Sequence, residues 1–218
     1  MIKAGHKRWA RLLFNQYINR SLRKHFSHFY LVNEPPRSAG IQGLMITPNH
    51  FSWWDGFFID YVMRHYSTRK LHIMMLEEQL KRYWFFRKLG AYSVDLRNPR
   101  SILESIQYTQ RILHDHENFV VYYPQGEIRP YDERPLKLKT GLQKVLKDIK
   151  VPTVVVPAAF KIQFGNEPKP DIFARFSSPL PGREIEKDFG IFTHEFCKNM
   201  NELDKASRET AYVTELFK

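Results

Sequence analysis

The spacing of apolar residues changes along the chain, from a helical period near the N-terminus to short continuous runs further on. Between residues 14 and 29 apolar side chains recur every three or four positions. This spacing predicts an amphipathic helix that carries Arg20, Arg23 and Lys24 on its polar side. Lys7 and Arg11 would fall on the apolar side of a longer helix, so we expect a break or a second short helix near residues 10–13.

Beyond residue 40, apolar runs alternate with segments of helical spacing. The cluster "NEPPRSAG" at residues 33–40 breaks regular structure and separates this part from the first helix. The runs predict strands at residues 43–47, 71–76, 119–123, 153–160 and 172–176. The intervening segments predict helices at residues 56–65, 77–88, 100–116 and 139–150, with residues 183–218 mainly helical. This alternation is typical of an α/β fold with a mostly parallel central sheet covered by helices.

We expect two parts in the chain, an N-terminal arm at residues 1–38 and one domain at residues 39–218. The net charge of +11 predicts an anionic partner, such as nucleic acid, phospholipid headgroups or a phosphate-rich co-substrate. Residues 1–33 carry seven Lys or Arg and no acid, which suits an anionic membrane surface. The alternative is that this helix packs on its own domain and leaves a solvated basic face.

The sequence contains no run of 18 uncharged apolar residues and no signal-peptide pattern. We therefore expect a peripheral protein at the cytoplasmic face of the cell membrane. Its single cysteine, Cys197, excludes an intrachain disulfide and is compatible with a reducing compartment.

A candidate acid/base pair lies in "TPNHFSWWDGFF" at residues 47–58, where His50 and Asp55 are five positions apart. In a continuous helix this spacing would turn the two side chains about 140° away from each other. Because Pro48 and Asn49 fit a turn after a strand, we expect His50 on a loop and Asp55 near a helix start. An imidazole oriented by a carboxylate can serve as a general base. The structural alternative is that His50 caps the helix and Asp55 is an acid of its first turn.

Four segments, taken together, resemble a known family. "NHFSWWD" at residues 49–55 resembles the N-H-x4-D signature of the glycerolipid acyltransferases, which include the lysophosphatidic acid and glycerol-3-phosphate acyltransferases. "YPQGEIRP" at residues 123–130 is similar to the second signature of this family, F-P-E-G-T-R. "LGAYSVDLR" at residues 89–97 and "VPTVVVPAAF" at residues 151–160 resemble two further blocks, in the same order along the chain.

The resemblance implies an acyltransferase of lipid metabolism and phospholipid biosynthesis. His50 would deprotonate the hydroxyl of a lipid-type acceptor, by default a lysophosphatidic acid, and Asp55 would hold the imidazole. The hydroxyl would then attack the thioester of acyl-CoA or of an acyl carrier protein. No cofactor is implied beyond this co-substrate, and we expect no metal site. "HDHE" at residues 114–117 is the densest group of potential ligands, but side chains two positions apart on a helix do not converge.

The sequence departs from the family pattern at the arginines that are implicated in holding the phosphate of the acceptor. Ile128 stands where the family has the arginine of F-P-E-G-T-R, and Leu96 separates the Asp-Arg pair of the middle block. The candidate acceptor-binding residues are therefore Gln125, Gly126, Glu127, Arg129 and Arg97. Gln125, Glu127 and Arg129 could equally bind the hydroxyls of an acceptor without phosphate, such as a glycolipid or a glycosylated terpenoid of the carotenoid type. The structural alternative is that these three are turn residues whose side chains satisfy local backbone groups.

Aromatic residues surround the candidate pair. Trp53, Trp54 and Phe57 are expected to border the acyl chain or to lie at the membrane interface, with core packing as the alternative. The segment at residues 77–90 mixes cations with aromatic rings and suits either a headgroup region or the end of a core helix. A basic nucleic-acid-binding protein is a further alternative, but the sequence shows no recognisable nucleic-acid module, so we expect no nucleic-acid partner.

Overall fold

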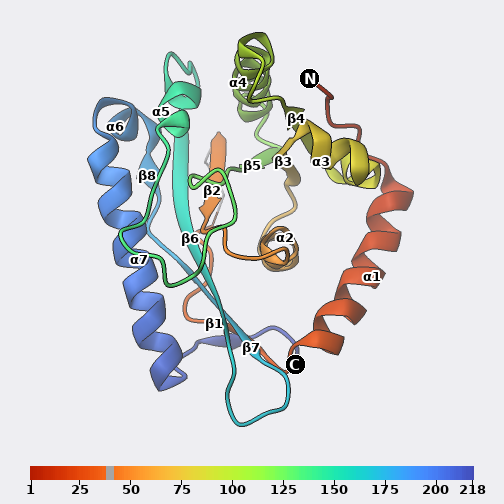
Figure 1. Cartoon of the computed structure of the whole chain (residues 1–218), viewed down its shortest axis with the longest axis vertical. Helices are drawn as coiled ribbons and strands as arrows, with labels where there is room; N and C mark the ends of the chain where they lie inside the picture. The colour runs from red at the N-terminus through yellow and green to blue at the C-terminus, as the bar shows by residue number, and fades with distance from the viewer. Residues whose placement is uncertain (38–41) are drawn as a thin grey trace.

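The structure is a computed structural model and describes residues 1–37 and 42–218. The expected boundary between arm and domain, at residues 38–39, lies outside the described residues. Within them, nine strands form one sheet in the order β4-β3-β5-β2-β6-β7-β1-β9, and β8 pairs with β6 (Figure 1). The strands are β1 (Phe29–Leu31), β2 (Gly43–Pro48), β3 (Lys70–Leu76), β4 (Ala91–Val94), β5 (Asn118–Val121), β6 (Thr153–Gln163), β7 (Asp171–Phe176), β8 (Leu180–Pro181) and β9 (Thr214–Glu215).

The sheet is mostly parallel, as the alternation of strands and helices predicts. All pairs from β4 to β6 along the sheet are parallel, and so is the pair of β1 with β7. The antiparallel pairs involve β7, β8 and β9 near one edge. The central strands are apolar throughout because both faces of the sheet are covered. In β2, for example, Leu44 and Ile46 belong to one buried cluster while Met45, between them, belongs to the other.

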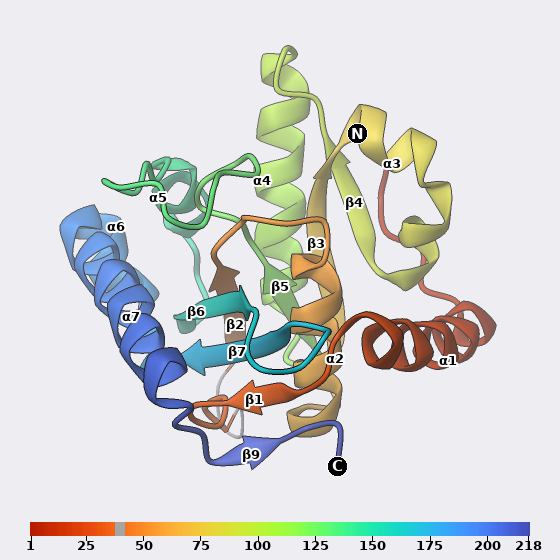
Figure 2. The same ribbon diagram turned by 60° about the horizontal axis from the view of Figure 1, so that its bottom comes forward.

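Helices form a layer on each face of the sheet (Figures 1 and 2). One layer contains α1 (Arg8–His25) and α2 (Asp55–Tyr66), and the other contains α4 (Pro99–Leu113), α5 (Gly141–Leu146), α6 (Gly182–Lys187) and α7 (Phe189–Glu209). The segment predicted as one helix at residues 77–88 is divided into α3 (Glu77–Arg82) and the 3-10 helix η1 (Trp84–Leu89). Among the described residues, none of these helices combines the length and the apolar character that crossing a membrane requires.

Helix α1 differs from the prediction at both ends. It is continuous from Arg8 to His25, so the break expected near residues 10–13 is wrong. Arg11 is accommodated on the inner side because its Nη1 lies 2.5 Å from Oδ1 of the buried Asp60, and its Nη2 donates to the carbonyl oxygen of Leu89 (3.0 Å). Helix α1 also ends four residues before the predicted end at residue 29.

The segment expected to form an arm is packed on the rest of the chain. Residues 29–31 form β1 inside the sheet, paired with β7 and β9. The apolar side of α1, with Phe14, Ile18 and Leu22, is buried in the core. At residues 1–7, backbone hydrogen bonds join Gly5 to the carbonyl oxygen of Arg87 (2.9 Å) and Lys7 to that of Lys88 (3.0 Å). The apolar side of this helix therefore packs on its own domain, as the alternative interpretation proposed.

Candidate active site

The candidate pair lies at the carboxyl edge of the sheet, in the connection from β2 to α2. Strand β2 ends at Pro48, His50 is on the loop that follows, and Asp55 is the first residue of α2. The loop folds back so that His50 Nδ1 lies 2.9 Å from Asp55 Oδ2. The carboxylate is fully buried, whereas the imidazole keeps 23% of its side-chain surface exposed. The spacing in the sequence correctly predicted one residue on a loop and the other at a helix start.

The carboxylate of Asp55 is held by several donors of its own loop. Its Oδ2 accepts from the backbone N–H groups of Phe51 (2.8 Å) and Ser52 (3.0 Å), and its Oδ1 accepts from Ser52 Oγ (2.9 Å). A carboxylate is also favoured at this position by the dipole of α2. Because an ionised carboxylate can only accept, the Nδ1–H of His50 donates to it, and the Nε2 lone pair remains available to take a proton.

The loop that carries His50 is fixed by two amide side chains. Asn49, which is buried, accepts from the N–H of Phe160 (2.7 Å) and donates to its carbonyl oxygen (2.9 Å), so it extends the pairing of β2 with β6. Gln125, also buried, accepts the backbone N–H of His50 at its Oε1 (2.6 Å). The backbone N–H of Arg129 donates to the carbonyl oxygen of His50 (2.9 Å). Both backbone groups of His50 are therefore engaged by the loop after β5.

Tyr123 is a neighbour of the candidate base to which the sequence analysis assigned no role. Its ring stacks on the imidazole of His50, with centroids 4.2 Å apart and planes inclined by 25°. The Tyr123 hydroxyl is buried and has no hydrogen-bond partner among the described residues. Burial raises the pKa of Tyr123 well above its usual value, and the negative charge of Asp55 acts in the same direction. The phenol is therefore neutral, and its ring is a platform for the imidazole.

Asn49 and Ser52 were also missed as residues that shape the site. Both lie inside the "NHFSWWD" segment, but the sequence analysis assigned Asn49 only to a turn and gave Ser52 no role. The signal for Ser52 was a hydroxyl three positions before an acid at a helix start. The partner of Asn49, Phe160, lies 111 positions further along the chain, so only the pairing of β2 with β6 reveals it.

The structure brings one of the two candidate arginines next to His50. Arg129 contacts the histidine loop through its backbone, and its guanidinium pairs with Glu127 (2.6 Å) and Glu133 (3.6 Å). Gly126, in the same turn, has a positive φ of 72°, and Lys139 packs against it. The side chains of Glu127 and Ile128, which follow Gly126 in the loop, are exposed.

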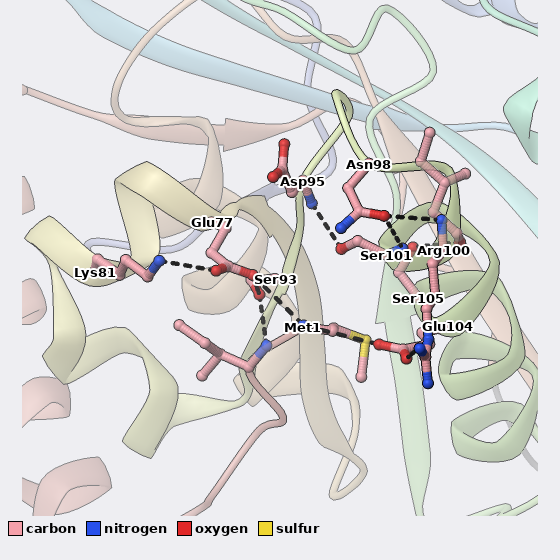
Figure 3. Close-up of polar contacts among 12 residues, drawn as sticks. Met1, Glu77, Lys81, Ser93, Asp95, Asn98, Arg100, Ser101, Glu104 and Ser105 are labelled. Atoms are coloured by element: carbon pink, nitrogen blue, oxygen red, sulfur yellow. Dashed lines mark hydrogen bonds and ion pairs between the residues drawn. The ribbon is translucent and has the colours of Figure 1, made fainter.

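Arg97 lies on the turn after β4, two strands further along the sheet from β5. It is exposed, and its guanidinium pairs with Glu78 (2.5 Å) and Asp95 (3.5 Å). The turn is built by side chains at the start of α4 (Figure 3). Asn98 Oδ1 accepts from the N–H groups of Arg100 and Ser101, and Ser101 Oγ accepts from the N–H of Asp95. Arg97 is therefore at the same edge as His50 but engaged with carboxylates of its own surroundings.

The three aromatic candidates occupy different environments. Trp53 is half exposed, and its ring meets that of Tyr83 with centroids 4.9 Å apart. Trp54 packs against Phe26 (5.3 Å between centroids), and Phe57 packs against Phe14 (5.8 Å). Trp54 and Phe57 thus join the core beneath α1, whereas Trp53 reaches the surface beside η1.

Comparisons with known proteins match the chain to one family and to one known fold. The sequence model of the acyltransferase family matches residues 30–161, a range that includes both the His50–Asp55 segment and the loop after β5. A search of curated proteins found no match. Among solved structures, the chain is similar to the crystal structure of the 1-acyl-sn-glycerophosphate (LPA) acyltransferase PlsC from Thermotoga maritima, with a TM-score of 0.61 and 16% identity. The alignment covers 88% of this chain and 77% of the Thermotoga chain, so the two share a fold.

Proposed function

Because this chain belongs to the acyltransferase family, we propose that it transfers a fatty acyl group from a thioester to the hydroxyl of a lipid-type acceptor, with His50 as the general base. One observation carries this assignment, the 2.9 Å contact of His50 Nδ1 with the buried carboxylate of Asp55. A base of this kind typically contributes about 10²- to 10⁴-fold to a rate, which suits an activated electrophile such as a thioester.

The proposed reaction needs no covalent intermediate on the protein. Nε2 of His50 takes the proton of the acceptor hydroxyl while the hydroxyl oxygen forms a bond to the thioester carbonyl carbon. The carbon–sulfur bond then breaks, and the leaving thiolate takes the proton back from the imidazolium. Asp55 stabilises the positive imidazolium between these two steps, and its own position is fixed by Phe51 and Ser52. The products are an ester and a free thiol, either coenzyme A or a carrier protein.

We propose a lysophosphatidic acid as the acceptor. The structural neighbour from Thermotoga is an acyltransferase of this substrate, and the net charge of +11 favours anionic substrates. A second class of acceptor is supported by one observation at the site. Arg129, whose backbone N–H contacts His50, already pairs through its guanidinium with Glu127 and Glu133. A sugar headgroup without phosphate, as in a glycolipid or glycosylated terpenoid, is therefore the second candidate.

The test is the release of free thiol from long-chain acyl-CoA and from acylated carrier protein in the presence of an acceptor panel. The panel contains lysophosphatidic acid, glycerol-3-phosphate and glycolipids, and the ester product is identified by mass spectrometry. We expect the wild-type protein to turn over with lysophosphatidic acid and His50→Ala to remain at the background rate. His65→Ala removes a histidine from the far end of α2 and is the control that should retain activity. Equal turnover by His50→Ala and wild type would exclude the proposed base.

We propose that the protein reaches its acceptor by lying on an anionic membrane surface through the outer side of α1 together with η1. This side is the opposite of the apolar one that the sequence analysis recognised. It exposes four large side chains between residues 9 and 17 of α1, which are Trp9, Leu12, Leu13 and Tyr17. Exposed Trp84 continues this surface on η1, and α1 lies at the outside of its layer (Figure 2). Aromatic and aliphatic side chains of this kind favour the membrane interface.

The charges around this surface match an anionic membrane. The ammonium of Lys88 lies 4.5 Å from the ring centroids of both Trp9 and Trp84. A cation between two interfacial indoles can pair with a lipid phosphate. Arg8, Arg20 and Lys24 are exposed along α1. Trp53, on the His50 loop, contacts Tyr83 beside η1, so this orientation also brings the candidate site close to the lipid layer.

The double substitution Leu12→Gln and Leu13→Gln is expected to lower binding to vesicles of phosphatidylglycerol and phosphatidylcholine at least about tenfold, because burying each leucine contributes about 1.5–3 kcal/mol. Co-sedimentation with the vesicles measures the effect. Leu103→Gln is the matched control, since Leu103 is 55% exposed on α4, in the opposite layer. Unchanged co-sedimentation of the double variant would contradict docking through α1.

A further inference from the structure

The loop at residues 122–140, between β5 and α5, carries most of the candidate acceptor-binding residues, and we call it the acceptor loop. A loop of this length without regular structure is commonly functional. Its first part is tied to the histidine loop by Gln125 and by the backbone of Arg129. Its two ends meet where the N–H of Lys139 donates to the carbonyl oxygen of Pro124 (2.8 Å). These contacts fix the first part and the two ends of the loop, so its middle must be held by other partners.

The middle of the loop is held by a polar cluster that draws on three parts of the fold. Tyr131 of the loop donates its hydroxyl to Asp204 Oδ1 on α7 (2.8 Å). Lys161 of β6 places its ammonium 3.1 Å from the same oxygen, and Arg134 of the loop lies 3.5 Å from Oδ2. Asp204 and Lys161 are both largely buried. Hydrogen bonds to an ionised group are stronger than those between neutral groups, and partial burial strengthens them further.

Tyr131 also contacts the loop that carries His50. Its ring meets that of Phe51 edge to face, with centroids 5.4 Å apart. Phe51 follows His50 in the chain and donates its backbone N–H to Asp55. Burial, followed by the hydrogen bond to the carboxylate of Asp204, raises the pKa of Tyr131, so the phenol stays protonated and donates. One side chain thus links α7 to the His50–Asp55 segment.

We propose that Tyr131 and Asp204 are positioning residues whose hydrogen bond latches the acceptor loop over the site beside His50. This inference rests on the proposed acyl transfer. Neither residue contacts the reacting atoms. Gln125 and the backbone of Arg129 hold His50 independently of the latch, so the base keeps its place when the latch is opened. Opening it instead frees the middle of the loop, which directly follows the candidate acceptor-binding residues Glu127 and Arg129 in the chain.

Tyr131→Phe removes the hydroxyl that donates the hydrogen bond and keeps the ring against Phe51. Asp204→Asn keeps the shape of the side chain that accepts this hydrogen bond but removes its charge. In both variants we expect the KM for the acceptor to rise about tenfold, the effect of losing one hydrogen bond to a charged group. We expect kcat within about twofold of wild type, and the KM for the donor and the pH profile of kcat to stay unchanged. Tyr212→Phe, which alters an exposed tyrosine outside this cluster, is the matched control.

Limited digestion with trypsin tests the latch without any assay of activity. The loop contains exposed cleavage positions at Lys137 and Lys139. We expect cleavage there to be several times faster in Tyr131→Phe and Asp204→Asn than in wild type and Tyr212→Phe. Unchanged cleavage together with an unchanged acceptor KM would overturn the proposal. A lower kcat at constant acceptor KM would also overturn it, because the residues would then act on the base. If the wild-type protein transfers no acyl group, the proposed function fails, and the cleavage rates still decide whether the latch exists.

Discussion

Replacement of Asp55 by asparagine is expected to lower kcat for thiol release about 10²- to 10⁴-fold, the full contribution of an oriented general base. The carboxylate accepts from His50 Nδ1 at 2.9 Å and thereby leaves Nε2 free of a proton. An asparagine can turn its amide nitrogen towards the ring, which selects the opposite tautomer, and it carries no charge to stabilise the imidazolium. Initial rates with acyl-CoA and lysophosphatidic acid measure the effect, and saturating concentrations ensure that these rates report kcat.

Ser52→Ala is the matched control for this prediction. It removes the hydrogen bond from Ser52 Oγ to Asp55 Oδ1 but keeps the carboxylate and its contact with the imidazole. We expect a loss of no more than about tenfold, in line with one hydrogen bond to a charged group. Thermal unfolding of both variants verifies that they fold. A rate for Asp55→Asn close to that of Ser52→Ala would show that the carboxylate is structural and that His50 acts without it.

The local geometry of the candidate pair could be predicted because short-range rules determine it. A proline after an apolar strand ends the strand, and an acid is favoured in the first turn of a helix, so His50 and Asp55 had to lie on different elements. The mostly parallel sheet followed from the alternation of strands and helices in the same way. The helix at residues 56–65 was predicted to within one residue at each end of α2.

The prediction failed where partners distant in the sequence decide the structure. The apolar spacing of residues 14–29 extends the helix to Phe29, but that residue pairs with Ile172 of β7 in the sheet. The hydrogen bond from the N–H of His50 to the carboxamide oxygen of Gln125, 75 positions later, was likewise not predicted. Such partners are set by the register of the strands and are not visible in the spacing of one segment.

Arg11 is the clearest example of a residue whose partner the sequence pattern did not reveal. A basic residue on the apolar side of a helix suggested a break, but Asp60, 49 positions later on α2, is 5% exposed and pairs with it. Arg64 approaches the other carboxylate oxygen, with its Nε 3.3 Å from Oδ2. Burial lowers the pKa of Arg64, and the charge of Asp60 opposes that shift. One buried carboxylate thus compensates two guanidinium groups where α1 and α2 meet.

Asp60→Asn is therefore expected to lower the free energy of unfolding by about 3–5 kcal/mol, because removing one partner leaves buried charge without compensation. Urea unfolding followed by circular dichroism measures this loss. Glu117→Gln breaks the exposed pair of Lys70 with Glu117 and should cost no more than about 1 kcal/mol. If both variants lose the same small amount, the contact of α1 with α2 depends on apolar packing alone. If Asp60→Asn loses the larger amount, the charge pair holds α1 in place, and the variant should also bind anionic vesicles less well, because the exposed side chains of α1 would no longer be presented on a fixed helix.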